Sequence, residues 1–201
     1  MNLNNFGGIV SIPLGFVSIL ALALILERLT FWLTTLYTQK SVKDDLLTHF
    51  CNASQKNMGL SLKPKNHPLV IFYESVINSK DNDFESLQRN IKLGFERVSP
   101  RLRRYDTALS SIVAISPLLG LLGTVLGLIR SFKGLGLGQP LENTEVVISG
   151  ISEALVSTAI GLVIAIITLA FTNLFRSFRR SEKHELLILA IKLEEHFLIL
   201  S

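Results

Sequence analysis

The sequence predicts an all-α integral membrane protein whose three transmembrane helices extend into a cytoplasmic helical bundle. Of its 201 residues, 48% are hydrophobic and only 18% are charged, whereas charged residues make up about a quarter of an ordinary soluble domain. The segments 1–26, 107–129 and 154–175 contain no Asp, Glu, Lys or Arg. A hydrocarbon core about 30 Å thick needs roughly 20 apolar helical residues to cross it, so each segment is long enough to span a membrane.

The same composition excludes several other classes of protein. The apolar content excludes a disordered chain, and the single cysteine, Cys51, excludes a disulfide scaffold. The net charge of +4 does not indicate nucleic-acid binding, because thirteen of the twenty basic residues lie in segment 27–106 and five in 176–201. Basic residues stay on the cytoplasmic side of a membrane. We therefore expect both segments to be cytoplasmic and the N-terminus to lie outside.

The first predicted span covers about residues 9–26. Met1–Phe6 has no basic region, and the apolar run ends in Leu-Glu-Arg-Leu rather than in a small-residue cleavage site, so a retained helix is favoured over a signal peptide. Pro13 lies in the first turns of this helix, where a missing N–H costs least. Arg28 and Trp32 are expected to mark the cytoplasmic interface.

Segment 27–106 has a strongly helical pattern. After a break within residues 52–68, which are rich in Asn, Ser, Lys and Pro, a short helix is predicted over 69–77. Asp81–Asp83 then offers a helix cap, and Pro100 is expected to bend the following helix as it leads into the second span, about residues 107–129. The apolar stripe of that helix consists of Phe84, Leu87, Ile91, Phe95 and Val98.

The third predicted span, about residues 148–175, continues as an amphipathic helix to Leu200. Such a helix would be roughly 80 Å long, far more than a bilayer needs. Its long apolar stripe can pack within one chain, but three spans offer little interior, so we expect a homo-oligomer. The stripe consists of Leu186, Leu189, Leu193, Phe197 and Leu200. The residues expected on the polar face are Glu182, Lys183, Glu185 and Glu194.

Small residues recur at helical spacing in the second and third spans. Such stripes let helix backbones approach closely, because lipid provides no hydrophobic driving force for helix association. Close packing fully explains the glycines and alanines of both stripes. The glycines assigned to this packing are Gly120, Gly123, Gly127 and Gly161.

One carboxyl group and two hydroxyl groups form a candidate polar site. Glu153 lies near the outer end of the third span, Thr158 lies about one turn further in, and Thr124 lies in the second span. An ionised side chain in a bilayer costs at least about 2.5–3.5 kcal/mol, so such a residue usually faces a cavity or a partner. The three groups could relay protons or solvate a partner's ionisable group. Alternatively, Glu153 lies in water and both threonines bond to their own helix carbonyls, and spacing does not decide between these interpretations.

No pattern indicates an enzyme, a metal site or a cofactor. The sequence contains no GxSxG, HExxH or Walker motif. His49 and Cys51 are interpreted as a solvated pair, and the glycines at 134, 136 and 138 as part of a turn.

Two long motifs resemble those of the ExbB/TolQ/MotA family. Residues 116–125, Ser-Pro-Leu-Leu-Gly-Leu-Leu-Gly-Thr-Val, are similar to the second-span motif of this family. Residues 151–162, Ile-Ser-Glu-Ala-Leu-Val-Ser-Thr-Ala-Ile-Gly-Leu, are similar to its third-span motif. The resemblance extends to Phe132 and Asn173 and covers all three spans, so residues 1–200 are expected to form a single domain of this family. Three spans rather than four favour its ExbB/TolQ branch.

The resemblance implies a fold and a mechanism. Family members form a pentamer whose second and third spans line a pore around the single-span helices of an ExbD- or TolR-like dimer. A membrane aspartate of that dimer takes up protons. By motif position, Thr124 and Thr158 would face this aspartate and Glu153 would lie at the outer mouth of the pore. Where the family often has a proline, this chain has Ala165-Ile166-Ile167, so the kink typical of the family is not predicted.

The expected function is that of a proton-conducting subunit in the bacterial inner membrane. It would couple the proton motive force to a TonB-like transducer for outer-membrane transport. The expected partners are protons, membrane lipids, the single-span dimer and the transducer, and nucleic acid is not expected. Two alternatives stay open: a TolQ-type subunit for envelope integrity and division, and a structural assembly ring that does not conduct protons.

Overall fold

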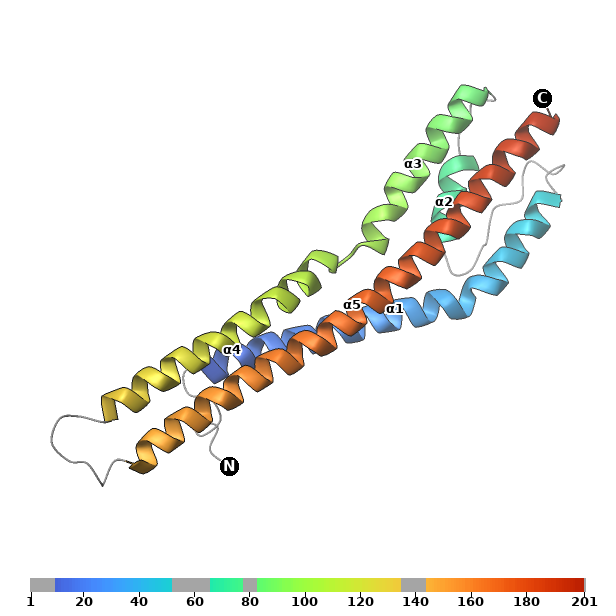
Figure 1. Ribbon diagram of the computed structural model, residues 1–201. Helices are drawn as coiled ribbons and strands as arrows, with labels where there is room; N and C mark the ends of the chain where they lie inside the picture. Colours follow the sequence, from blue (N-terminus) through green and yellow to red (C-terminus); the bar gives the residue numbers. More distant parts are fainter. Residues whose placement is uncertain (1–9, 52–65, 78–82, 135–143, 201) are drawn as a thin grey trace. The chain divides into compact units, whose positions relative to one another are not determined.

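The computed structural model describes residues 10–51, 66–77, 83–134 and 144–200. These residues form helices and contain no strand, so the predicted all-α class is confirmed. Three helical stretches, Ser11–Leu46, Phe84–Phe132 and Val147–Leu198, are long and apolar enough to cross a membrane. In chain order the helices are α1 (Ser11–Cys51), α2 (Pro68–Ile77), α3 (Phe84–Leu102), α4 (Asp106–Gly134) and α5 (Thr144–Leu200), as Figure 1 shows.

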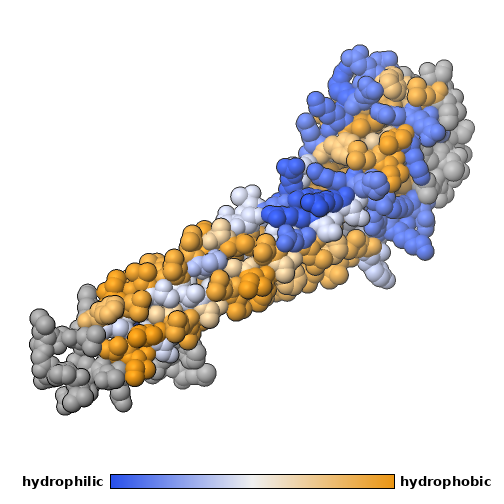
Figure 2. Space-filling view, in the orientation of Figure 1, coloured by the Kyte–Doolittle hydropathy of each residue, from blue (hydrophilic) through white to orange (hydrophobic). Residues whose placement is uncertain are grey.

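The chain divides into two compact units. Unit 1 comprises the described residues of Met1–Glu27 and Tyr105–Leu174, and unit 2 those of Arg28–Arg104 and Phe175–Ser201. Helices α1 and α5 therefore contribute to both units. The visible face of unit 1 is largely hydrophobic, whereas that of unit 2 is rich in hydrophilic side chains (Figure 2). This division follows the predicted separation of membrane-spanning from cytoplasmic segments.

Each predicted span lies inside a longer helix. The span over 9–26 falls in α1, apart from residue 9, which lies outside the described residues. The spans over 107–129 and 148–175 fall in α4 and α5. Helix α5 continues without interruption through Ile166 and Ile167, as expected where the sequence has no proline.

The core of unit 1 is small and apolar. Val10, Leu14 and Ala21 of the first span pack with Ile112 of α4 and Ile164 of α5. The opposite face of α1 is exposed. Ile12 is 77% exposed, and the large apolar residues that follow it on this face over the next two turns are nearly as exposed. Exposed apolar side chains on a spanning helix are compatible with contact to lipid, whereas in water they would be unfavourable.

In unit 2, helix α3 ends at Leu102 rather than bending into the second span. Pro100 removes one backbone N–H, and Tyr105 has a φ of 63°, so the helix stops and α4 starts anew at Asp106. The buried Arg28 guanidinium donates hydrogen bonds to Arg101 O and Leu102 O, at 3.1 and 2.8 Å. It thereby satisfies carbonyls that a helix end leaves without partners.

The short helix predicted over 69–77 is confirmed as α2, which starts at Pro68. It packs against α3 through Phe72 and Phe95, whose ring centroids lie 4.9 Å apart. A Cβ added at Gly94 would lie 2.9 Å from Phe72 Cδ2, so this glycine allows the close contact. Asp83 occupies the cap position of α3 without a side-chain cap bond. The expected break falls mostly in residues 52–65 and most of the predicted cap in 78–82, outside the described residues.

The described members of the two predicted apolar stripes of unit 2 are buried or half-buried, and the side chain of Leu200 lies outside the described residues. Phe84 of α3 and Phe197 of α5 bring their ring centroids to 6.2 Å. Trp32, which we expected at the membrane interface, is completely buried beside Phe178. The buried members of the stripes are Ile91, Val98, Leu186, Leu189 and Leu193.

Glu182 is a correction to the predicted polar face of α5, because its residue is only 2% exposed. Its Oε1 lies 4.0 Å from His67 Nδ1, but that nitrogen accepts a hydrogen bond from Leu69 N–H, while His67 Nε2 donates to Thr35 O. His67 is therefore neutral and gives no proton to the carboxyl. Glu182 lies four residues before Leu186 on the buried stripe, so its position in the helical period outweighs its charge.

Burial raises the pKa of Glu182 to about 7, an effect that Glu185 strengthens and Lys43 opposes. The folded protein therefore binds this proton more tightly than the unfolded chain does. The resulting stability is fully present below the unfolded pKa of about 4.5 and is lost as the pH rises toward and through 7. The loss is on the order of 3 kcal/mol.

We expect Glu182→Gln to stabilise unit 2 above pH 7, because the amide carries no charge to bury. Thermal unfolding in detergent between pH 5 and 8.5 measures this, as the difference in apparent Tm between variant and wild type. That difference should grow with pH. His67, whose pKa burial lowers, weakens both proteins equally at low pH. The exposed Glu195 on the same helix gives the control Glu195→Gln, and an equal, pH-independent shift in both variants contradicts the prediction.

Candidate functional site

Helices α4 and α5 approach each other closely through glycines. A Cβ added at Gly161 would lie 2.5 Å from Ser116 O, and one at Gly127 would lie 2.9 Å from Gly150 O. Both distances are shorter than a methyl group tolerates, so the two backbones are in near contact. The glycines at this contact are Gly120, Gly123 and Gly127 of α4 and Gly150 and Gly161 of α5.

Thr158 connects the two helices by a hydrogen bond. Its Oγ1 donates to Gly120 O of α4 at 2.9 Å, and a Cβ at Gly120 would lie 3.0 Å from Thr158 Cα. Thr124, one turn further along α4, donates instead to Leu121 O of its own helix at 2.7 Å. The structure therefore matches the back-bonding alternative for Thr124 and not for Thr158. Both side chains are half-buried.

Glu153 forms an ion pair that the sequence did not reveal. Its Oε2 accepts a hydrogen bond from Arg130 Nη1 at 2.8 Å. The Glu153 side chain is 13% exposed, so it is not a freely solvated carboxylate, whereas the Arg130 side chain is 47% exposed. Arg130 lies just beyond the predicted second span of about 107–129, in the last turns of α4. The partners are 23 residues apart, so no local periodicity could have paired them.

The C-terminal end of α4 and the N-terminal end of α5 are also joined beside this ion pair. Ser131, the residue after Arg130, is buried and its Oγ lies within hydrogen-bond distance of Gly127 O, at 3.1 Å, and of Val147 O, at 3.2 Å. On the α5 side, Ser157 Oγ donates to Glu153 O. These contacts limit how far the two backbones can shift where Arg130 and Glu153 meet.

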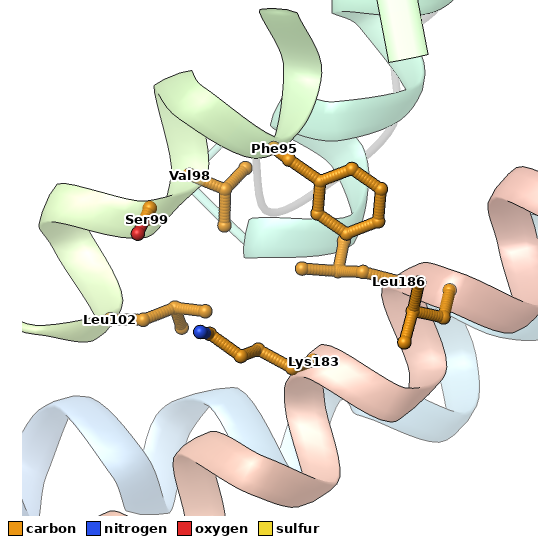
Figure 3. Close-up of a pocket in the computed structure, with 7 residues that line it drawn as sticks. Phe95, Val98, Ser99, Leu102, Lys183 and Leu186 are labelled. Carbon is orange, nitrogen blue, oxygen red and sulfur yellow. The ribbon is translucent and has the colours of Figure 1, made fainter. Parts of the chain in front are cut away.

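A separate hollow of about 300 Å³ lies in unit 2 between α3 and α5 (Figure 3). Its lining has no carboxyl, imidazole or thiol, and its polar members are Ser99 and Lys183, whose nitrogen lies beside Leu102 in Figure 3. Among the described residues, no group of three or more His, Cys, Asp or Glu side chains could hold a metal ion. The side chains of His49 and Cys51 are outside that description. The candidate functional groups are therefore those on α4 and α5.

Comparison with known proteins supports a family assignment. The profile of the MotA/TolQ/ExbB proton channel family matches residues 55–187, which include Thr124, Arg130, Glu153 and Thr158. The ExbB-like 3 biopolymer transport protein of Synechocystis sp. is 40% identical over 85% of this chain and 82% of its own length. The biopolymer transport protein ExbB of Salmonella typhimurium is 39% identical, and the Tol-Pal system protein TolQ of Pseudomonas aeruginosa is 36% identical. Each of these two matches covers 51% of this chain and 43% of the relative.

We expect Gly161→Ala to weaken the contact between α4 and α5. The added methyl group meets a backbone carbonyl, which cannot rotate away, so the helices must separate at a cost of about 2 kcal/mol. The apparent Tm of the detergent-solubilised protein measures this loss. Gly15→Ala is a matched control, because a Cβ at Gly15 has no neighbour within 4 Å and alanine favours a helix. A Gly161→Ala variant as stable as the Gly15→Ala variant contradicts the prediction.

Proposed function

Because the chain belongs to the MotA/TolQ/ExbB proton channel family, we propose that it is the proton-conducting subunit of a bacterial inner-membrane motor complex. In this complex it couples the proton motive force to a TonB-like transducer for outer-membrane transport. Three stretches able to span the membrane support this proposal, and so does the row of polar groups on α4 and α5. The distribution of basic residues supports a periplasmic N-terminus and a cytoplasmic C-terminus.

The subunit is proposed to act as a pentamer around an ExbD- or TolR-like single-span dimer. Apolar surface on the cytoplasmic part of α5 supports an oligomer. Leu187, Ile191 and Leu198 lie on this part of the helix, and they are 50%, 61% and 63% exposed. Lipid cannot cover them outside the bilayer, so neighbouring protein is the favourable cover. Residues 1–200 form one functional domain in this proposal, with the two compact units as its membrane and cytoplasmic parts.

The hydrogen bonds of Thr124 and Thr158 determine which partner group they fit. A hydroxyl has one donor hydrogen and two acceptor lone pairs. Both hydrogens are used, on Leu121 O and Gly120 O, so each oxygen faces a partner as an acceptor. An acceptor fits a protonated carboxyl group, which donates a hydrogen bond, and does not fit a carboxylate. The partner's membrane carboxyl is therefore held while it carries a proton and is released when it loses the proton.

A TolQ-type function is the second candidate. TolQ of Pseudomonas aeruginosa matches the same share of this chain as the Salmonella ExbB does. In that case the subunit supports envelope integrity and division rather than uptake. Purifying the complex from its native cells and identifying the single-span partner separates the two candidates. A ring that only assembles the complex is the remaining alternative, and it predicts no proton flux.

We expect Thr158→Val to reduce proton flux by about tenfold or more, because it keeps the side chain's shape and removes the acceptor oxygen. Thr158→Ser keeps the oxygen and should conduct. The measurement is proton uptake by liposomes that contain the purified complex with its partner, read with a pH-sensitive dye.

The control for this experiment is Thr168→Val on the same helix, where the buried hydroxyl bonds to Ile164 O. This variant also loses one hydroxyl from α5, but away from the proposed pathway, and should retain its flux. Undiminished flux in both Thr158→Val and Thr124→Val would falsify the assigned role of the two hydroxyls. A wild-type complex that passes no protons favours the assembly ring.

A further inference from the structure

The Arg130–Glu153 ion pair has a feature that simple helix anchoring does not require. Glu153 uses Oε2 for the guanidinium, while its Oε1 is buried and has no hydrogen-bond partner among the described residues. Leaving a buried acceptor of a charged group without a partner is costly, so such an atom suggests a missing donor. The donor has to come from outside this chain's described residues.

Arg130 determines where the second oxygen points. A carboxylate held through one oxygen by a guanidinium loses the rotation that would otherwise let its oxygens exchange places. The backbone of Arg130 is itself restrained, because the neighbouring Ser131 is buried and hydrogen-bonded where α4 and α5 are joined. The carboxylate of Glu153 is therefore presented in one orientation by a partner on the adjacent helix.

We propose that Arg130 is a positioning residue of the proton pathway, which holds Glu153 so that its Oε1 accepts a hydrogen bond from a water molecule delivering protons at the outer end. This inference rests on the proposed function and adds Arg130 to it. Arg130 itself transfers no proton, because a guanidinium is not deprotonated in proteins. Its side chain is 47% exposed, whereas that of Glu153 is 13% exposed, so the positioning group is more accessible to solvent than the carboxylate that it holds.

A second interpretation is that the ion pair merely clamps α4 to α5. The two interpretations differ in what they require of the carboxylate. A clamp needs opposite charges on the two helices, whichever helix carries each charge. A positioned proton acceptor needs the carboxylate at residue 153, beside Thr158 on the same helix, and its second oxygen in the observed orientation.

The test is proton flux in liposomes containing the wild-type complex or its variants with the co-purified partner, together with the assembled mass in detergent. We expect Arg130→Gln to lower flux about tenfold or more with assembly retained, since small displacements of reacting groups have effects of this size. Arg130→Lys keeps the charge on a flexible stem and should restore part of the flux. Arg89→Gln is the matched control, because Arg89 pairs with Glu85 at 3.9 Å on an exposed surface. It should leave flux unchanged.

The decisive variant exchanges the charges, Arg130→Glu with Glu153→Arg. We expect it to assemble, because the opposite charges still face each other, and to lose flux, because the carboxylate has moved to α4. Recovery of both assembly and flux overturns the inference in favour of a clamp, and so does wild-type flux in Arg130→Gln. If Arg130→Gln does not assemble, the exchanged pair and Arg130→Lys decide, since both keep an ion pair. Absence of flux in the wild-type complex refutes the proposed function itself. Flux in the wild-type complex that is unchanged in Arg130→Gln refutes this inference alone.

Discussion

The close approach of α4 and α5 is the constraint on which the membrane part of this protein depends. In a bilayer the hydrophobic effect does not hold helices together, so packing and hydrogen bonds must do so. Glycines at 120, 127 and 161 remove the side chains that would separate the backbones. That proximity brings Thr158 Oγ1 to Gly120 O and Arg130 to Glu153. Without it, each of these polar groups would face lipid or its own helix.

The polar groups of the proposed proton pathway differ in how much hydrogen-bonding capacity they leave for a partner. Thr124 and Thr158 have used their hydrogens and offer acceptor oxygens. Glu153 accepts a hydrogen bond from Arg130 at Oε2, and its Oε1 has no hydrogen-bond partner among the described residues. Each group is thus held in place by one bond and left able to form another. In the proposed pathway, this arrangement would combine fixed positions with acceptor atoms that stay available.

Unit 2 differs from unit 1, because it buries charged side chains among its helices. Arg28 is 1% exposed and satisfies the carbonyls at the end of α3, where Pro100 and Tyr105 interrupt the helical path. Glu182 is buried without such compensation, which raises its pKa to about 7. The first arrangement stabilises a chain break, and the second makes the stability of the unit depend on pH.

The sequence by itself determined the features that depend on neighbouring residues. Hydrophobicity summed over about 20 residues located the spans, and helical periodicity located the buried stripes and the glycine contact. The motifs also identified Thr124, Glu153 and Thr158. Only the tertiary structure decided that Thr158 bonds across helices, that Arg130 holds Glu153 and that Glu182 is buried against His67. These three depend on residues more than 20 positions apart, and periodicity within one helix carries no information about which turn of another helix lies opposite.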